Sequence, residues 1–428
     1  MLNKIKDAAH KVFSNEALRK KLFFTALIIL AFRVIASIPV AIADVNKIQS
    51  IFEGSDFLTL LNIFSGGTLI RFSVAAVGIN PYITASIIMQ LVGMIIPSIK
   101  ELQKEGESGQ MKVNQWTRMI AVPLALVQSI SVIALLKSQS LLFEVTPLAL
   151  VAAIVSLIAG AMISMWLGEL ISEYGLGNGI SMIMFAGIIS QLPSALVQIS
   201  LMIKAGQIST LAIFSVVFLT IIALVVFMNE AVRKITVEYA KRIRGGKILG
   251  GQKTHLPVRV NVAGVMPIIF ALSLMLVPSF LARILIGLEN ESLVSFGELL
   301  LVWFDQSSIF YMIFYFLLVF IFTFFSALIF FNAQDLSDEL KKSGAFIPGV
   351  RPGKATKEFL EFVVIRITFV GALFLGFIAL LPSIAQAVTQ IQSLAIGGTS
   401  VLIVVSVILE TSKQAEGQLV GQDYEKYS

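Results

Sequence analysis

The chain has 428 residues and a formal net charge of +6. Apolar residues make up 57% of it and charged residues 14%, against about 45–50% and about 25% in soluble domains. A water-soluble fold of this length could not cover so much apolar surface, and the absence of cysteine excludes disulfides, thiol catalysis and cysteine metal sites.

Long apolar runs recur along the chain between charged stretches. Because the hydrocarbon core of a bilayer, about 30 Å thick, takes about 20 helical residues, each such run predicts a membrane-spanning helix. Ten spans are predicted, at Leu22–Pro39, Ser73–Pro97, Met119–Leu136, Pro147–Leu167, Ile180–Ile203, Ser209–Met228, Val262–Leu288, Ile309–Phe331, Phe362–Leu381 and Leu394–Leu409. The first run is too long for a signal-peptide apolar region and no small-residue cleavage pattern follows it, so it is expected to stay as an anchor. The sequence therefore predicts an all-α integral membrane protein.

Basic residues are distributed unevenly between the segments that connect the spans. If both termini lie on one side, the segments on that side carry 25 lysines and arginines and the opposite segments carry 4. The positive-inside rule then places both termini in the cytoplasm, together with two long loops at about residues 229–260 and 332–361. The net charge thus indicates topology more than nucleic-acid binding, while the length of the two loops favours docking surfaces for partners.

The spans hold few side chains that could carry chemistry. No acidic residue lies clearly in mid-span, which argues against proton or sodium coupling. Both histidines, His10 and His255, fall in cytoplasmic segments, so a serine protease within the membrane lacks its base. No span holds the two aspartates that an aspartyl protease would need. The chain is therefore predicted not to be an enzyme, and no cofactor or metal is expected.

A short apolar segment, Phe57–Ile70, precedes the second span and contains the pair Gly66-Gly67. It is too short to cross a bilayer, which is typical of a re-entrant or interfacial segment. Since non-helical backbone at membrane depth is tolerated only where protein buries it or water reaches it, the segment predicts an internal cavity. A loosely packed external loop is the alternative.

Four of five strings of residues lie within predicted spans or beside their ends, and the fourth string lies in the loop at 332–361. The five strings are NIFSGGTLIRFSVAAVGINPYITASIIMQL at 62–91, YGLGNGIS at 174–181, THLPVRVNVAGVMPIIF at 254–270, KKSGAFIPGVRPGKAT at 341–356 and GGTSVLIVV at 397–405. In this order they resemble the SecY family of secretion channels from end to end of the chain. The first looks like the family's plug helix and second span, and the fourth like its most recognisable cytoplasmic loop.

The resemblance implies a fold of ten spans in two inverted five-helix halves, residues 1–205 and 206–428, with a lateral gate between the second and seventh spans. It implies a channel of the general secretory pathway in the bacterial plasma membrane, which passes unfolded polypeptides and releases membrane segments sideways into lipid. The implied partners are SecE, SecG, the SecA motor ATPase, the ribosome, signal sequences and nascent polypeptides. No nucleic-acid function beyond ribosome docking is implied.

Roles for individual residues follow from the same resemblance. The implied apolar pore ring consists of Ile83, Ile87, Ile180, Met184, Ile269 and Ile403. The implied plug, about residues 57–70, includes Phe57, Leu61, Phe64, Gly66, Gly67 and Ile70. Docking of SecA or the ribosome is implied at Arg351, Arg242, Arg244 and Lys247. The two ring residues in the second span, like the two in the fifth, stand four apart and so share a helix face, which permits the assignment.

Two other functions remain open at this point. A secondary transporter of a small solute also uses inverted repeats and broken helices. A non-conducting membrane scaffold would have the same composition. Small subunits that resemble SecE and SecG, purified together with the chain in place of a bound solute, would separate the channel from both alternatives.

Overall fold

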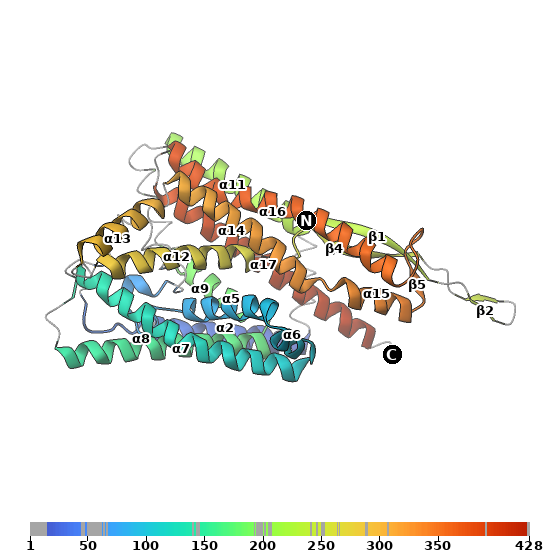
Figure 1. The fold of residues 1–428 in the computed structure, drawn as a ribbon, viewed down its shortest axis with the longest axis horizontal. Helices are drawn as coiled ribbons and strands as arrows, with labels where there is room; N and C mark the ends of the chain where they lie inside the picture. Colours follow the sequence, from blue (N-terminus) through green and yellow to red (C-terminus); the bar gives the residue numbers. More distant parts are fainter. Residues whose placement is uncertain are drawn as a thin grey trace.

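The computed structural model describes residues 15–43, 48, 62, 65, 67–138, 141–142, 146–191, 193, 200, 203, 208–239, 242–244, 247–249, 253–262, 264, 266–286, 290–305, 308–389 and 392–425. Its elements are α2 (Glu16–Ala36), η1 (Leu69–Arg71), α5 (Asn80–Ile95), α6 (Pro97–Lys104), α7 (Glu107–Ser138), α8 (Pro147–Tyr174), α9 (Gly179–Ile189), α11 (Ile208–Glu230), β1 (Val232–Tyr239), β2 (Arg242–Arg244), β3 (Lys247–Leu249), β4 (Lys253–Arg259), α12 (Met266–Ile286), α13 (Glu291–Trp303), α14 (Ile309–Phe330), α15 (Ala333–Lys342), β5 (Ala345–Phe346), α16 (Lys354–Thr389) and α17 (Gln392–Glu425). The described chain is mostly helical, and its long helices run along the long axis of the molecule (Figure 1).

Each of the ten predicted apolar runs overlaps one of these helices, namely α2, α5, α7, α8, α9, α11, α12, α14, α16 and α17. Within the described residues, five helical stretches are both long and apolar enough to cross a membrane: Ser108–Lys137, Pro147–Tyr174, Met266–Arg283, Ile309–Lys342 and Lys354–Ile384. These helices confirm a multi-spanning helical membrane protein. The crossing of all ten runs stays a prediction.

Capping residues fix where several helices begin. The side chain of Asn178 accepts a hydrogen bond from Ser181 N at the start of α9, and Asn15 accepts from Ala17 N and Leu18 N at the start of α2. Such caps satisfy backbone N–H groups that have no partner inside the helix, and each is worth about 1 kcal/mol. The beginning of α9 is therefore set by its sequence as well as by packing.

The helix of the second apolar run begins later than predicted. A helix was expected from Ser73, but residues 73–79 form turns and α5 begins only at Asn80. Ser73 bridges to Pro39, so the chain before α5 is bound to the end of α2. Gly78 has a φ of +62°, and a Cβ there would lie 2.4 Å from Ser65 Cα, so this close crossing requires glycine.

The loop at about 229–260 contains a β-hairpin, which the predicted all-α fold omits. Strands β1 and β4 pair antiparallel with Val232 opposite Arg259, and β5 adds to the other edge of β1. Alternate residues Ile235 and Val237 are buried in a cluster that also contains Leu360 of α16. Alternation of apolar and polar residues over the strand produces this one-sided burial.

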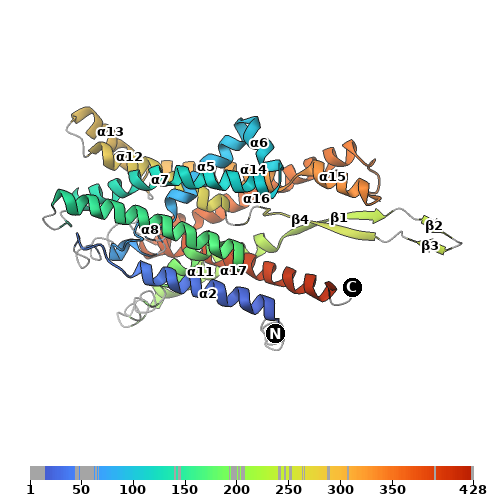
Figure 2. The same ribbon diagram turned by 90° about the horizontal axis from the view of Figure 1, so that it is seen from below.

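The chain's helices gather in two groups, with α12 between them. Figure 1 shows α2, α7 and α8 along one side of the molecule and α11, α14 and α16 along the other. Helix α12 contacts α5 and α7 from the first group and α14 from the second. Figure 2 shows the start of α2, the end of α17, the β-strands and α15 at one end, with α13 at the opposite end. This arrangement is the one expected if both termini and both basic loops share a side of the membrane.

Candidate functional site

The six predicted pore-ring residues lie in one apolar cluster at the centre of the molecule. The fully buried members come from four helices: Ile83 and Ile87 from α5, Met184 from α9, Ile269 from α12 and Ile403 from α17, each between 0% and 3% exposed. Ile180 of α9 is half-buried and packs against the same cluster. All six residues therefore belong to the main apolar core or pack against it, and their arrangement as a ring stays a prediction.

Close backbone packing positions the α9 contribution. A Cβ on Gly179 would lie 1.7 Å from the carbonyl oxygen of Gly168, so α8 and α9 approach to a distance that only glycine permits. Gly177 just before α9 has a φ of +90° and lies against Thr411 of α17. The glycine-rich string before the fifth span thus packs α9 between two other helices and directs Met184 into the cluster.

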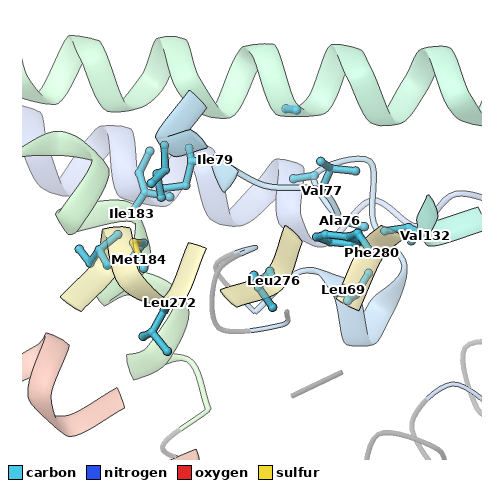
Figure 3. Packing of buried hydrophobic residues seen from close by; sticks show 14 of the residues in the cluster. Leu69, Ala76, Val77, Ile79, Val132, Ile183, Met184, Leu272, Leu276 and Phe280 are labelled. Carbon is cyan, nitrogen blue, oxygen red and sulfur yellow. The ribbon is translucent and has the colours of Figure 1, made fainter. Parts of the chain in front are cut away.

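Helix α12 is buried on all sides near Ile269. The consecutive residues Ile268, Ile269, Phe270, Ala271 and Leu272 are each at most 5% exposed. A helix that is apolar all round belongs inside a protein or a membrane, and α12 here has protein on both sides. Figure 3 shows Met184 of α9 near Leu272 of α12, with Phe280 of α12 near Leu69 and Val132.

The ring residues offer no polar atom for catalysis or ligand binding. Aliphatic and thioether side chains from four helices can pack to exclude water, and the same side chains can rotate aside when something passes between the helices. Narrow apolar constrictions empty of water and so resist ions. The arrangement is suited to a seal.

The predicted plug is described only at its end. Phe57, Leu61, Phe64 and Gly66 lie outside the described residues. Gly67 has a φ of +78°, and a Cβ there would come 3.1 Å from both Gly187 O and Ser190 Oγ. Ile70 donates its N–H to Asn62 Oδ1 over 3.1 Å, and Leu69 joins the central cluster. The end of the plug segment therefore rests on the last turn of α9, the helix that carries Met184.

The second predicted docking loop forms an ordered turn between β5 and α16. Thr356 Oγ1 donates to Arg351 O over 2.9 Å, and Ser337 Oγ donates to Gly353 O over 2.8 Å. Gly349 and Gly353 both have positive φ, so the turn depends on glycine. The turn leaves Arg351 exposed. Its backbone is fixed while its guanidinium is available to a partner.

The other three predicted docking residues lie on the short hairpin β2–β3. Arg242 pairs with Leu249, and Arg244 pairs with Lys247. Figure 2 shows this hairpin beyond β1 and β4, at the far end of the molecule. The basic residues thus stand at the tip of the longest projection.

A polar cavity of about 290 Å³ lies between α11, α12 and α17, and sequence reasoning missed it. Among its lining residues, Asn261 Nδ2 donates to Asn229 Oδ1 over 3.1 Å, and Lys413 Nζ donates to Asn229 O over 2.8 Å. Lys413 also pairs with Glu230 at 2.8 Å. The sequence places Asn229 and Asn261 just outside two apolar runs, but the contact between them depends on the fold.

These features define a multi-spanning helical membrane protein with an apolar core between two groups of helices. The SecY family model matches residues 73–412 of the chain. The protein translocase subunit SecY of Streptomyces galbus is 41% identical, with 97% of this chain and 98% of that protein covered. The chain belongs to the SecY family.

Two solved structures share the fold at lower sequence identity. One, described as the structure of a protein conducting channel, has a TM-score of 0.66 at 20% identity and covers 93% of this chain and 91% of that chain. Sec61 in the canine ribosome-channel complex from the endoplasmic reticulum has a TM-score of 0.60 at 19% identity, with the same coverage of 93% and 91%.

Proposed function

We propose that this chain is the central channel of a secretory translocase, which moves unfolded polypeptides across the membrane and releases apolar segments sideways into lipid. The observation that carries the proposal is the apolar cluster formed by Ile83, Ile87, Met184, Ile269 and Ile403 from four helices. Membership of the SecY family supports it.

The cluster acts as the pore ring, in which Ile180 completes the circle. A threading polypeptide exposes peptide groups that would each cost several kcal/mol if left unsatisfied in lipid. Helices that part around the chain give it a path through protein, and apolar side chains that close behind it stop ions. The thioether of Met184 adapts to varied passing side chains because it has three rotatable bonds.

The plug segment supports the closed state from the side of the ring where Gly67 contacts α9. Opening toward lipid occurs between α5 and α12, which contact each other. A signal sequence favours the open state by partitioning into lipid, with about −0.3 to −0.6 kcal/mol for each leucine at the helix centre. Ten leucines give about 3–6 kcal/mol, which is enough to shift a two-state equilibrium by orders of magnitude.

SecE, SecG, the SecA motor and the ribosome are the proposed partners, in a bacterial plasma membrane with both termini cytoplasmic. The exposed Arg351 turn and the β2–β3 hairpin are the proposed docking surfaces for the motor and the ribosome. The basic composition of both segments supports a cytoplasmic placement.

Purification from native membranes tests this function against the alternatives. A translocase channel is expected to carry small SecE-like and SecG-like subunits in stoichiometric amounts. A secondary transporter of a small solute would instead purify without them and would catalyse solute uptake in vesicles. Solute-dependent uptake by the chain alone would contradict the channel.

A further inference from the structure

Helix α13 packs against α12 at the end of the molecule opposite the β-strands. A Cβ on Gly297 would lie 2.8 Å from Ala282 O and 2.9 Å from Ile286 Cγ1, so glycine permits the two helices to touch. Figure 2 shows α13 projecting with the end of α12 from the side of the bundle. One face of α13 is thus covered by α12, and its other flanks point away from the protein.

The two uncovered flanks of α13 differ in chemistry. Leu293, Phe296 and Trp303 are spaced by three and seven residues, so they share one flank, and they are 38%, 53% and 46% exposed. Glu291 and Glu298 stand seven residues apart on another flank and are exposed. Leu299 and Val302, which are 43% and 69% exposed, lie between the two flanks, so the exposed apolar surface extends to the edge of the acids. A helix with a broad exposed apolar surface and acids along one edge is suited to a boundary between lipid and water.

The apolar flank is continuous with an exposed apolar surface of α14. The ring of Trp303 lies 5.4 Å from that of Phe310, which stacks 5.9 Å from Phe314 along α14. Helix α14 belongs to a stretch that is long and apolar enough to cross a membrane, and Phe310 and Ile313 on it are exposed. Lipid that covers α14 therefore meets Trp303 at the end of the helix.

We propose that α13 is an interfacial helix, whose flank of Leu293, Phe296 and Trp303 binds lipid acyl chains of the outer leaflet while Glu291 and Glu298 stay in water. Tryptophan at such a boundary keeps its ring among the chains and its indole N–H near the headgroups. Residues 284–340 contain no lysine or arginine, so binding depends on apolar area and needs no anionic lipid. Because α12 is the neighbour of α13, this contact ties the outer end of α12 to the bilayer.

Trp303 is a natural reporter, because the chain contains only Trp116, Trp166 and Trp303. The full-length variant Trp116→Phe/Trp166→Phe would be reconstituted in phosphatidylcholine vesicles that carry bromine either near the headgroup or near the chain end. We expect headgroup-proximal bromine to quench Trp303 by about twofold, with weaker quenching from chain-end bromine and no change when phosphatidylglycerol is added. Unquenched Trp303 in either lipid would overturn the proposal.

Two matched references calibrate the quenching. Trp116→Phe/Trp303→Phe leaves Trp166, which is 55% exposed on α8 within a membrane-crossing stretch, as the lipid-facing standard. The Trp303 variant in vesicles without bromine gives the unquenched reference. Fluorescence of Trp303 in brominated vesicles equal to this reference, while Trp166 is quenched, would contradict an outer-leaflet contact.

A second measurement uses the absence of native cysteine. In the vesicles, Glu298→Cys should react with an impermeant maleimide about tenfold faster than Phe296→Cys, because only the acidic flank stays in water. Equal rates would overturn the proposal. Slow labelling of Phe296→Cys together with unquenched Trp303 would also overturn it, since protein would then cover the flank. Neither readout depends on translocation, so a failure of this proposal would leave the proposed channel function unaffected.

Discussion

The guanidinium of Arg33 donates a hydrogen bond through Nη2 to the carbonyl oxygen of Ala186. Arg33 lies on α2 and Ala186 lies in the last turn of α9, where the helix dipole is negative. Ser190 N shares the same carbonyl at 3.1 Å. This contact fixes the end of α9, the helix that carries Met184 and supports Gly67.

Loss of this contact should destabilise the protein. Arg33→Met keeps a long side chain but removes the charge at the helix end, for an expected loss of about 1–2 kcal/mol in the free energy of unfolding. Thermal unfolding of the purified protein in detergent measures it. The matched control is Arg366→Met on α16, because the Arg366 guanidinium lies 3.9 Å from the Phe362 ring centroid on an exposed surface. An Arg33→Met variant as stable as the control would contradict the role of Arg33.

Gly67→Ala should raise the resting ion leak through the channel. Alanine at a φ of +78° costs about 1–2 kcal/mol, and its Cβ would press on Gly187 O at 3.1 Å, so the plug end should lift from α9. Conductance in planar bilayers measures the leak. Gly344→Ala is the control, since φ is +69° there but nothing lies within 4 Å of the added Cβ. Equal ion leak in the two variants would contradict packing of the plug end against α9.

Hydration of the apolar ring should also open it to ions. Both Ile87 and Ile269 are buried, and asparagine at the two positions would bring amide groups that hold water in the constriction. We expect the double variant Ile87→Asn/Ile269→Asn to leak ions at rest. The double variant Ile87→Leu/Ile269→Leu keeps the ring apolar and should stay closed. If the asparagine pair conducts no more than the leucine pair, these residues do not form the seal.

Translocation should depend on the shape of the side chain at position 351 as well as on its charge. Arg351→Lys keeps the charge but loses the planar fork that binds carboxylates or carbonyls in two places, so SecA-driven translocation in reconstituted vesicles should fall. Arg351→Glu should abolish translocation at unchanged abundance. Lys354→Glu is the control, because the Lys354 side chain is 91% exposed and pairs only loosely with Glu358 at 4.0 Å. Normal translocation by Arg351→Glu would remove the docking role.

Local patterns predicted much of this fold. Apolar runs located ten of the thirteen α-helices in the described chain, because burial in lipid or protein demands long apolar stretches. The shorter helices α6, α13 and α15, which lie between these runs, were missed. The spacing of Ile83 and Ile87 predicted a shared face, and both side chains are buried in the central cluster. The late start of α5 was missed, since the bridge between Pro39 and Ser73 is set by a distant segment.

Contacts between distant segments account for the rest. Arg33 and Ala186 stand 153 residues apart, and no local pattern indicates that an arginine in one apolar run completes the end of another. The hairpin of β1 and β4 was missed because only helices were predicted, although Ile235 and Val237 alternate with polar residues. The six ring residues were predicted from the family resemblance alone. Spacing along the chain cannot relate residues on four different helices.

The central claim is that a translocating polypeptide passes the ring formed by α5, α9, α12 and α17. A photoreactive amino acid placed at Ile269 should crosslink to a precursor arrested midway through translocation, because the side chain lies in the proposed path. The same amino acid at Leu219 of α11, which is 63% exposed, should crosslink to lipid and leave the precursor unmodified. A precursor that has entered the vesicle partway without crosslinking to position 269 would contradict the account.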